Sequence, residues 1–245
     1  MGETIDKHES GTSFSAWDNL GDEVPFSGGA ISEGDKPSEK PLNAGEPWTG
    51  FPSETEGMNE NEPDVNGVPQ TAWRGERYYL DNIDELGRRN LSTKGHEATH
   101  NRDGKVYLAR DKMYASLYAV GTDGVTWYDD PLPVENIPIG VIFKINNSGN
   151  HLGAEPTSPE PEDWGPFAGK HREFIADEVP IEDCEVQEIY IMDDFIANDG
   201  RGHERSDFRR PMEVFKVKGQ SELPEVVEKV KKRMLELDAE RKNKQ

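Results

Sequence analysis

Between residues 71 and 217, short apolar runs alternate with polar turns, and six of these runs have the length and composition of β-strands. The run at 138–145 is long and apolar enough to form a central strand. Two short helical patterns lie among the strands, one ending at Gly87 and one, rich in aromatic residues, ending at Gly121. Several strands with two small helices predict an α+β domain rather than alternating βαβ units. The expected strands are 71–74, 106–109, 138–145, 173–176, 186–192 and 212–217, and the helical positions are Leu80, Ile83 and Leu86, then Met113, Tyr114, Leu117 and Tyr118. We expect the two tyrosines of the second pattern, Tyr114 and Tyr118, to face the core.

Residues 218–245 carry a third helical pattern, in which six apolar residues form one stripe at helical spacing. Pro224 and Glu225 suit the first turn of a helix. We therefore predict an amphipathic helix, which packs on its own domain or, alternatively, docks a partner or self-associates. The stripe consists of Leu223, Val226, Val227, Val230, Met234 and Leu237.

Residues 1–70 have a different composition from the rest of the chain. They hold 15 Asp and Glu against 3 Lys, together with 10 Gly and 7 Pro, and show neither helical nor strand periodicity. We expect a mostly disordered acidic arm at 1–70, a folded domain at 71–217 and the amphipathic helix at 218–245. The isolated aromatic residues of the arm could instead serve as docking segments or lie across the folded domain; they are Phe14, Trp17, Phe26, Trp48 and Phe51.

Charge and composition exclude several classes of function. The 245 residues carry a formal net charge of −21, which repels phosphate backbones and anionic lipid, so we expect neither non-specific nucleic-acid binding nor membrane binding. We find no run long enough for a membrane span and no signal-peptide pattern. We therefore expect a protein that is made in the cytoplasm and either acts there or is delivered elsewhere as an effector. The single cysteine, Cys184, excludes an intrachain disulfide and a Cys-rich zinc site.

Three separated segments resemble one known family. They are 73–77 with the sequence Trp-Arg-Gly-Glu-Arg, the strand and helix at 106–119, and 171–182, where Glu173 begins a strand that a Val-Pro turn follows. In this order they resemble the mono-ADP-ribosyltransferase toxins, most closely the catalytic subunits of pertussis toxin and heat-labile enterotoxin, over roughly residues 71–192. The resemblance implies an α+β split β-sandwich with small flanking helices, built around a cleft for NAD.

The resemblance also implies an activity and roles for individual residues. The expected reaction transfers ADP-ribose from NAD to a macromolecular acceptor, most simply a protein, and releases nicotinamide. Cleavage of the nicotinamide–ribose bond develops positive charge on the ribose, which the carboxylate of Glu173 would stabilise. Arg74 would bind NAD or brace the cleft, with Arg77 as a second cofactor-binding residue. His100, or else His96, would assist at the ribose or the acceptor.

The chain departs from the family pattern at two places. The Ser-Thr-Ser triplet of the family aligns with 108–110, Leu-Ala-Arg, so Tyr107 is the candidate that takes over its contact with NAD; otherwise it is a core aromatic of the strand. The residue two positions before Glu173, which selects the acceptor in relatives, is His171. If the protein is an active transferase, it therefore catalyses the reaction without the hydroxyl triplet.

Two other functions compete with the transferase. Residues 96–100 spell His-Glu-Ala-Thr-His, the zinc-hydrolase pattern in which two His side chains one helical turn apart bind the metal. Glycines flank this pattern and no apolar stripe precedes it, which favours an exposed loop over a zinc helix. A transferase-like domain could also bind a nucleotide or a protein without catalysis, with the acidic arm occupying a basic surface of the partner.

Overall fold

The structure is a computed structural model, and it describes residues 41–53, 55–58, 64–65, 67–92, 105–120, 132–148, 155–157, 159–160, 169, 171–193 and 211–243. All of these residues fall within one compact unit, Lys40–Gln245. Neither α-helix of the described chain combines the length and the apolar surface that crossing a bilayer requires.

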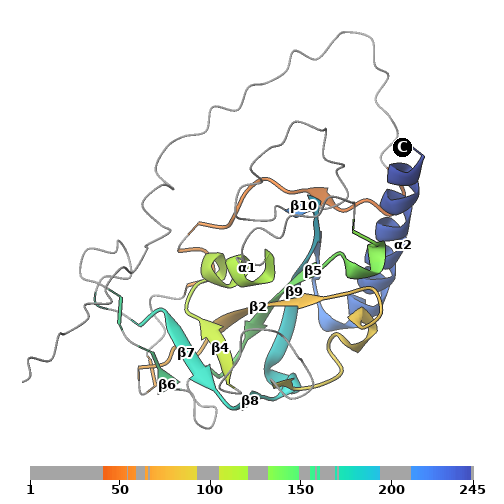
Figure 1. Cartoon of the computed structure of the whole chain (residues 1–245). Coiled ribbons are helices and arrows are strands. Elements are labelled where there is room, and N and C mark those ends of the chain that lie inside the picture. The colour runs from red at the N-terminus through yellow and green to blue at the C-terminus, as the bar shows by residue number, and fades with distance from the viewer. Residues whose placement is uncertain are drawn as a thin grey trace, which may run out of the picture. The chain divides into compact units, whose positions relative to one another are not determined.

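The described chain forms an antiparallel sheet with the strand order β1-β10-β9-β5-β2-β4-β7-β6 (Figure 1). A separate two-stranded ribbon pairs β3 with β8. All six strands expected from the sequence are present, and the mixture of an antiparallel sheet with helices confirms the α+β class. The strands are β1 Glu46–Pro47, β2 Ala72–Tyr78, β3 Leu91–Ser92, β4 Val106–Ala109, β5 Ile139–Ile145, β6 Glu155–Pro156, β7 Glu173–Ala176, β8 Glu178–Val179, β9 Cys184–Met192 and β10 Pro211–Lys216.

The sheet is joined weakly between β2 and β4. Along its whole length β2 pairs with β5, from Ala72 opposite Ile145 to Tyr78 opposite Ile139. Its only residue pair with β4, in contrast, is Trp73 opposite Ala109. The sheet therefore has two halves, one formed by β1, β10, β9, β5 and β2 and the other by β4, β7 and β6. The pair of Trp73 and Ala109 joins them.

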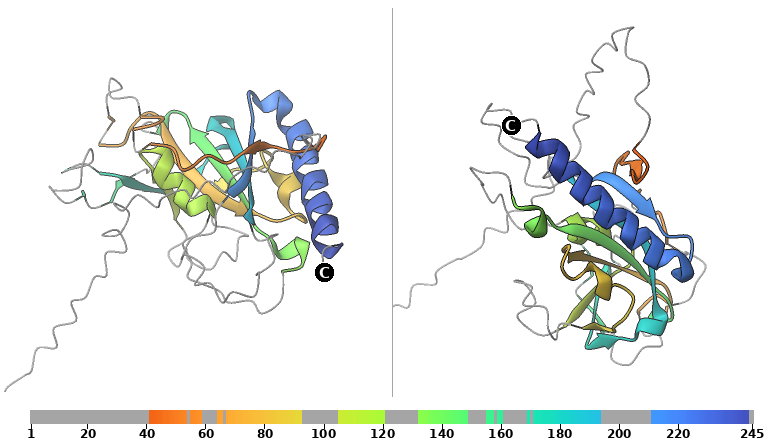
Figure 2. Two further views of the ribbon diagram at one scale, coloured as in Figure 1. Left: turned by 90° about the horizontal axis from the view of Figure 1, so that it is seen from above. Right: turned by 90° about the vertical axis from the view of Figure 1, so that its right-hand side faces the viewer.

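Two α-helices cover opposite faces of the sheet (Figure 2). Helix α1, Lys112–Val120, lies on β2, β4 and β5, whereas α2, Leu223–Lys242, lies along β9 and buries its whole predicted stripe in the main core. The predicted amphipathic helix therefore packs on its own domain. Short 3₁₀ turns complete the fold: Ile83–Glu85, Val134–Asn136, Ile181–Asp183 and Gln220–Glu222.

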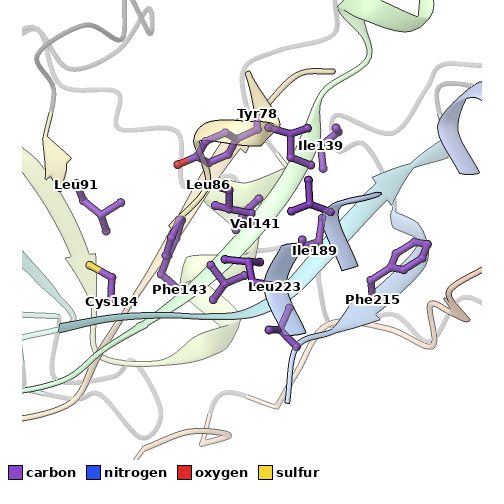
Figure 3. Packing of buried hydrophobic residues seen from close by; sticks show 14 of the residues in the cluster. Tyr78, Leu86, Leu91, Ile139, Val141, Phe143, Cys184, Ile189, Phe215 and Leu223 are labelled. Carbon is purple, nitrogen blue, oxygen red and sulfur yellow. The ribbon is translucent and has the colours of Figure 1, made fainter. Parts of the chain in front are cut away.

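The main core lies between the sheet and α2. It is built from alternate residues of the central strands, such as Val141 and Phe143 of β5, which are fully buried together with Ile189 of β9 (Figure 3). Leu223 of α2 and Leu86, which follows the first 3₁₀ turn, close it on the helix side. Gly87 ends that turn with φ +73°, a left-handed conformation that favours glycine, as the predicted helix stop requires.

Helix α1 buries only part of the face that the sequence predicts. Leu117 is buried as expected and Tyr114 is half-buried, but Tyr118 is 43% exposed. The fully buried side chains are instead small ones, such as Ala115, Ser116 and Ala119. The reason lies in the sheet beneath it: a Cβ on Gly75 would come within 1.9 Å of the Ala115 carbonyl oxygen. Because a glycine lets the helix backbone approach so closely, only small side chains fit beneath it, and the tyrosines are turned aside.

The folded unit begins earlier than the expected boundary at residue 70. Residues 41–53 and 55–58, which we call the strap, belong to this unit, and Glu46 and Pro47 of the strap form β1 beside β10. Trp48 and Phe51 stack edge to face at 5.2 Å and pack against the smaller core cluster beside α1. These two aromatic residues therefore lie across the domain, the alternative that the sequence left open. Residues 1–40, the N-terminal part of the predicted arm, lie outside the described residues.

Removing the strap should destabilise the folded unit. Its loss would remove Glu56, whose carboxylate is 2.9 Å from Lys112 Nζ, and the Gly57 carbonyl that accepts a hydrogen bond from Trp73 Nε1. We expect a chain of residues 59–245 to unfold about 5 °C or more below a chain of residues 40–245, measured by circular dichroism. Leu42→Ala changes a strap side chain that is 94% exposed, so this control variant should leave the midpoint unchanged. Equal midpoints for the two chain lengths would contradict this role of the strap.

Cys184 should resist thiol reagents in the folded protein. Its side chain is 5% exposed, and its thiol donates a hydrogen bond to the Pro180 carbonyl. Burial raises the pKa of the Cys184 thiol to about 12, because the thiolate would lose its hydration, and the charges of Glu76 and Asp183 add to the shift. At pH 8 we expect the native thiol to react at least about 100-fold more slowly than free cysteine, with the normal rate restored in denaturant. Rapid reaction of the native protein would contradict this burial.

Candidate functional site

The three segments that carry the resemblance lie on neighbouring strands, β2, β4 and β7 (Figure 1). Glu173, the first residue of β7, pairs with Ala109 of β4, which in turn pairs with Trp73 of β2. Paired residues of antiparallel strands point to the same face of a sheet. Glu173 therefore lies on the face that α1 covers, half-buried at the edge of the helix.

A tyrosine of α1 holds the carboxylate of Glu173. The Tyr118 hydroxyl donates a hydrogen bond of 2.5 Å to Glu173 Oε1. One turn earlier, Tyr114 packs edge to face against Tyr118, with ring centroids 5.4 Å apart and planes at 90°. Burial, and then the negative charge of Glu173, raise the pKa of Tyr118 far above its usual range, so its hydroxyl stays protonated and donates.

A buried ion pair lies next to this contact. Arg172 Nε donates to Asp111 Oδ2 at 2.9 Å, and Nη2 donates to Oδ1 at 3.4 Å. Asp111 is fully buried and Arg172 is 6% exposed. The Arg172 guanidinium also lies over the Tyr114 ring, 4.5 Å from its centroid. The pair joins the residue before α1 to the residue before β7.

Glu160 places a second carboxylate near Glu173. Burial raises the pKa of Glu160; the positive charge of Arg172 opposes this shift, and the negative charges of Glu173 and Asp111 add to it. The raised pKa means that Glu160 takes up a proton more readily than a fully solvated glutamate does. We call Asp111, Tyr114, Tyr118, Glu160, Arg172 and Glu173 the Glu173 cluster.

Arg74 lies on the opposite face of the sheet from Glu173. It follows Trp73 by one residue in β2, and successive side chains of a strand point to opposite faces. Its Nε donates to Glu76 Oε1 at 2.6 Å, and its Nη1 donates to the Tyr107 carbonyl oxygen at 2.7 Å. The bond to Tyr107 ties β2 to β4 close to their single residue pair, and the bond to Glu76 holds the guanidinium in place within β2. The geometry therefore favours the bracing role for Arg74 over direct contact with NAD.

Tyr107 and Arg77 both lie on the face of the sheet that carries Glu173, but only Tyr107 lies close to Glu173. Tyr107 pairs with Ile175, two residues from Glu173 on the same face, and a diagonal neighbour in a sheet is about 7 Å away. Arg77 pairs with Gly140 of β5 and lies four residues beyond the β2–β4 junction, about 13 Å along the strand. Of these two, only Tyr107 is placed where it can contribute to the Glu173 cluster.

His171 is held by the loop that precedes β7. Its Nδ1 is 2.6 Å from the Thr157 carbonyl oxygen. A carbonyl oxygen can only accept, so Nδ1 carries the proton and Nε2 is the nitrogen that remains for another partner. The Thr157 hydroxyl and backbone N–H both donate to the Glu173 carbonyl oxygen, at 3.1 Å and 3.0 Å. This loop therefore fixes the backbone on which both His171 and Glu173 are carried.

Arg110, the last residue of the segment that replaces the hydroxyl triplet, makes contacts that join separate segments of the domain. Its Nε donates to the His171 carbonyl oxygen, and its two terminal nitrogens form a two-point pair with the Asp64 carboxylate at 3.1 Å and 3.0 Å. Its guanidinium lies 5.2 Å from the Phe174 ring centroid, on the face away from Glu173. Arg110 thus joins the segment before β2 to β4 and β7.

Two candidate histidines follow the first helical pattern, which ends at Gly87. His96 and His100, and with them the whole zinc-hydrolase pattern at 96–100, lie outside the described residues. Among the residues that the structure does describe, no three His, Cys, Asp or Glu side chains gather in a way that could hold a metal ion.

Glu173 is the one member of the cluster to which the sequence assigned a functional role. Asp111, Glu160 and Arg172 were not singled out, and the two tyrosines were expected in the core. A signal was present for Asp111, because an aspartate three residues before Tyr114 and directly ahead of a helical pattern is typical of an N-cap. The partners of Arg172 and Glu160 come from distant segments and had no comparable signal.

Comparison with known proteins gives no further guide to this site. The chain matches no protein-family model, no curated protein and no solved structure, so its function has to be argued from the Glu173 cluster itself.

Proposed function

We propose that this protein is a mono-ADP-ribosyltransferase that cleaves the nicotinamide–ribose bond of NAD and transfers ADP-ribose to a macromolecular acceptor. The observation that carries the proposal is the contact between Glu173 and Tyr118. It sets the carboxylate that the resemblance assigns to catalysis beside a pair of tyrosine rings. The split β-sandwich of this family is part of the proposal, and the single residue pair between β2 and β4 supports it.

The chemistry of the cluster suits this reaction. When the bond between ribose C1′ and the nicotinamide nitrogen breaks, positive charge develops on the ribose, and a nearby carboxylate stabilises it. Tyr118 occupies only Oε1 of Glu173, and among the described residues no donor reaches Oε2, which can accept a bond from a ribose hydroxyl. The exposed part of Tyr118 offers an aromatic surface for the nicotinamide ring.

A non-catalytic NAD-binding protein is the second candidate. The observation in its favour is the segment 108–110, where leucine, alanine and a structurally committed arginine replace the hydroxyl triplet. If the protein is instead an active transferase, we propose that Tyr107, which lies on the face of Glu173, supplies a hydroxyl in place of the triplet.

Nicotinamide release from NAD by the purified protein, with a cell lysate as the source of acceptors, tests the proposal. Release together with labelling of a lysate component by ADP-ribose is the expected result. Saturable NAD binding by calorimetry without release would support the second candidate instead. Absence of both binding and release would refute both, and a metal analysis would then test the zinc-hydrolase pattern at 96–100, for which stoichiometric zinc is required.

A further inference from the structure

We propose that Asp111 and Arg172 are positioning residues that set the contact between Tyr118 and Glu173. The inference rests on the proposed function, because it concerns the residues that hold the carboxylate which we place at the reacting bond. It starts from one structural property. The carboxylate of Asp111 is bonded both to the helix that carries Tyr118 and to Arg172, the residue directly before the strand that carries Glu173.

On the helix side, Asp111 fixes where α1 begins. Its Oδ1 accepts a hydrogen bond of 2.8 Å from the backbone N–H of Tyr114, the third residue of the helix. This is the N-cap bond that satisfies a free backbone donor of the first turn. The start of a helix determines which way each later residue points, so the cap also fixes the direction of Tyr118, one turn beyond Tyr114.

On the strand side, Asp111 fixes the residue next to Glu173. Its carboxylate receives two donors from Arg172, while the Arg172 carbonyl oxygen accepts a bond of 2.8 Å from the Arg110 backbone N–H. Arg172 is therefore held through both its side chain and its backbone. Its guanidinium also lies over the Tyr114 ring, which packs against Tyr118, so the chain of contacts closes on itself.

Burial separates these two residues from the chemistry. Asp111 is fully buried and Arg172 is 6% exposed, so neither presents a charged group to a substrate in the way that Glu173 does. A buried ion pair is a weak source of net stability, but its geometric demands can select one arrangement of the elements that it joins. Here the selected arrangement is the one that brings the Tyr118 hydroxyl to Glu173 Oε1.

The protonation state of the Tyr118 hydroxyl reports its contact with Glu173 directly, and no substrate is needed to measure it. We would place 3-fluorotyrosine, which is more acidic than tyrosine, at position 118 of the full chain and follow its titration by ¹⁹F NMR. Glu173 and Tyr114 face this hydroxyl, and Arg172 and Glu160 face Tyr114. If the hydroxyl moves away from Glu173, its ionisation becomes easier and the midpoint falls.

Arg172→Lys keeps the positive charge but loses the planar fork that bonds Asp111 at two points. We expect this variant to lower the midpoint at position 118 by about one pH unit or more. A matched probe at Tyr79, which is 36% exposed and lies outside the cluster, should not move. The double variant Asp111→Asn with Arg172→Gln removes the ion pair without leaving a buried unpaired charge, and Asn still caps the helix. It should lower the midpoint in the same way.

An unchanged midpoint at position 118 in these folded variants would overturn the inference. Where the parent protein turns over NAD, both variants should also lower kcat by about 10- to 100-fold, as expected when a reacting group is displaced. A parent protein that neither binds NAD nor releases nicotinamide would refute the proposed function, while the ¹⁹F midpoint would still decide whether Asp111 and Arg172 set the contact.

Discussion

Replacing Glu173 by glutamine should lower the rate of nicotinamide release from NAD by about 1000-fold while leaving the protein folded. Glutamine has nearly the same shape, and its amide oxygen can still accept the hydrogen bond from Tyr118. What it lacks is the negative charge that offsets the positive charge developing on the ribose. Because Glu173 is half-buried at the edge of α1, we expect the melting temperature to change little.

Two further variants make this test specific. Glu182→Gln removes an exposed carboxylate of the same unit and should leave nicotinamide release unchanged. Tyr118→Phe keeps the aromatic ring but removes the donor to Glu173, and we expect an intermediate loss of about 10-fold, typical of a hydrogen bond to a charged group. Normal release by the Glu173→Gln variant would rule out the assignment of this site.

The strands and the long helix could be predicted from the sequence because their signals are local. In β5, for example, Ile139–Ile145 is a nearly continuous apolar run, and the structure places it between β2 and β9 at the centre of the sheet. The stripe of α2 likewise repeats over four turns, long enough for its period to be unambiguous. In both cases a single segment contains all the information that its burial requires.

The face of α1 and the path of the strap depend instead on distant partners. In α1, the aromatic pair Tyr114 and Tyr118 gives a clear helical face, but burial is decided by Gly75 and Gly140 on the strands beneath. Similarly, nothing near Trp48 indicates that β10 offers a free edge more than 160 residues later. The same dependence on distant partners limits what the sequence reveals of the site. Glu173 was identified through its motif, but the residues that hold its side chain come from separate segments.

Replacing Gly75 by alanine should have the largest effect on stability, because it prevents α1 from resting on the sheet. The added Cβ would lie 1.9 Å from the Ala115 carbonyl oxygen and 2.6 Å from the Ala119 nitrogen. Both are backbone atoms of α1, so relief requires the whole helix to move away from β2. We expect a loss of about 3 kcal/mol or more in the free energy of unfolding, measured by urea denaturation, at the upper end for overpacking of a core.

Two other glycines, Gly140 and Gly219, serve as controls for the size of this loss. At Gly140 a Cβ would meet the flexible end of Met192 at 2.6 Å and the Ala119 carbonyl oxygen only at 3.0 Å, so Gly140→Ala should cost about 1 kcal/mol. At Gly219 no atom lies within 4 Å, and Gly219→Ala should change stability by less than about 0.5 kcal/mol. Since Tyr118 reaches Glu173 only while α1 rests on β2, a folded Gly75→Ala protein should also lose the raised pKa of Tyr118. Similar losses at Gly75 and Gly219 would show that α1 does not pack on β2 through Gly75.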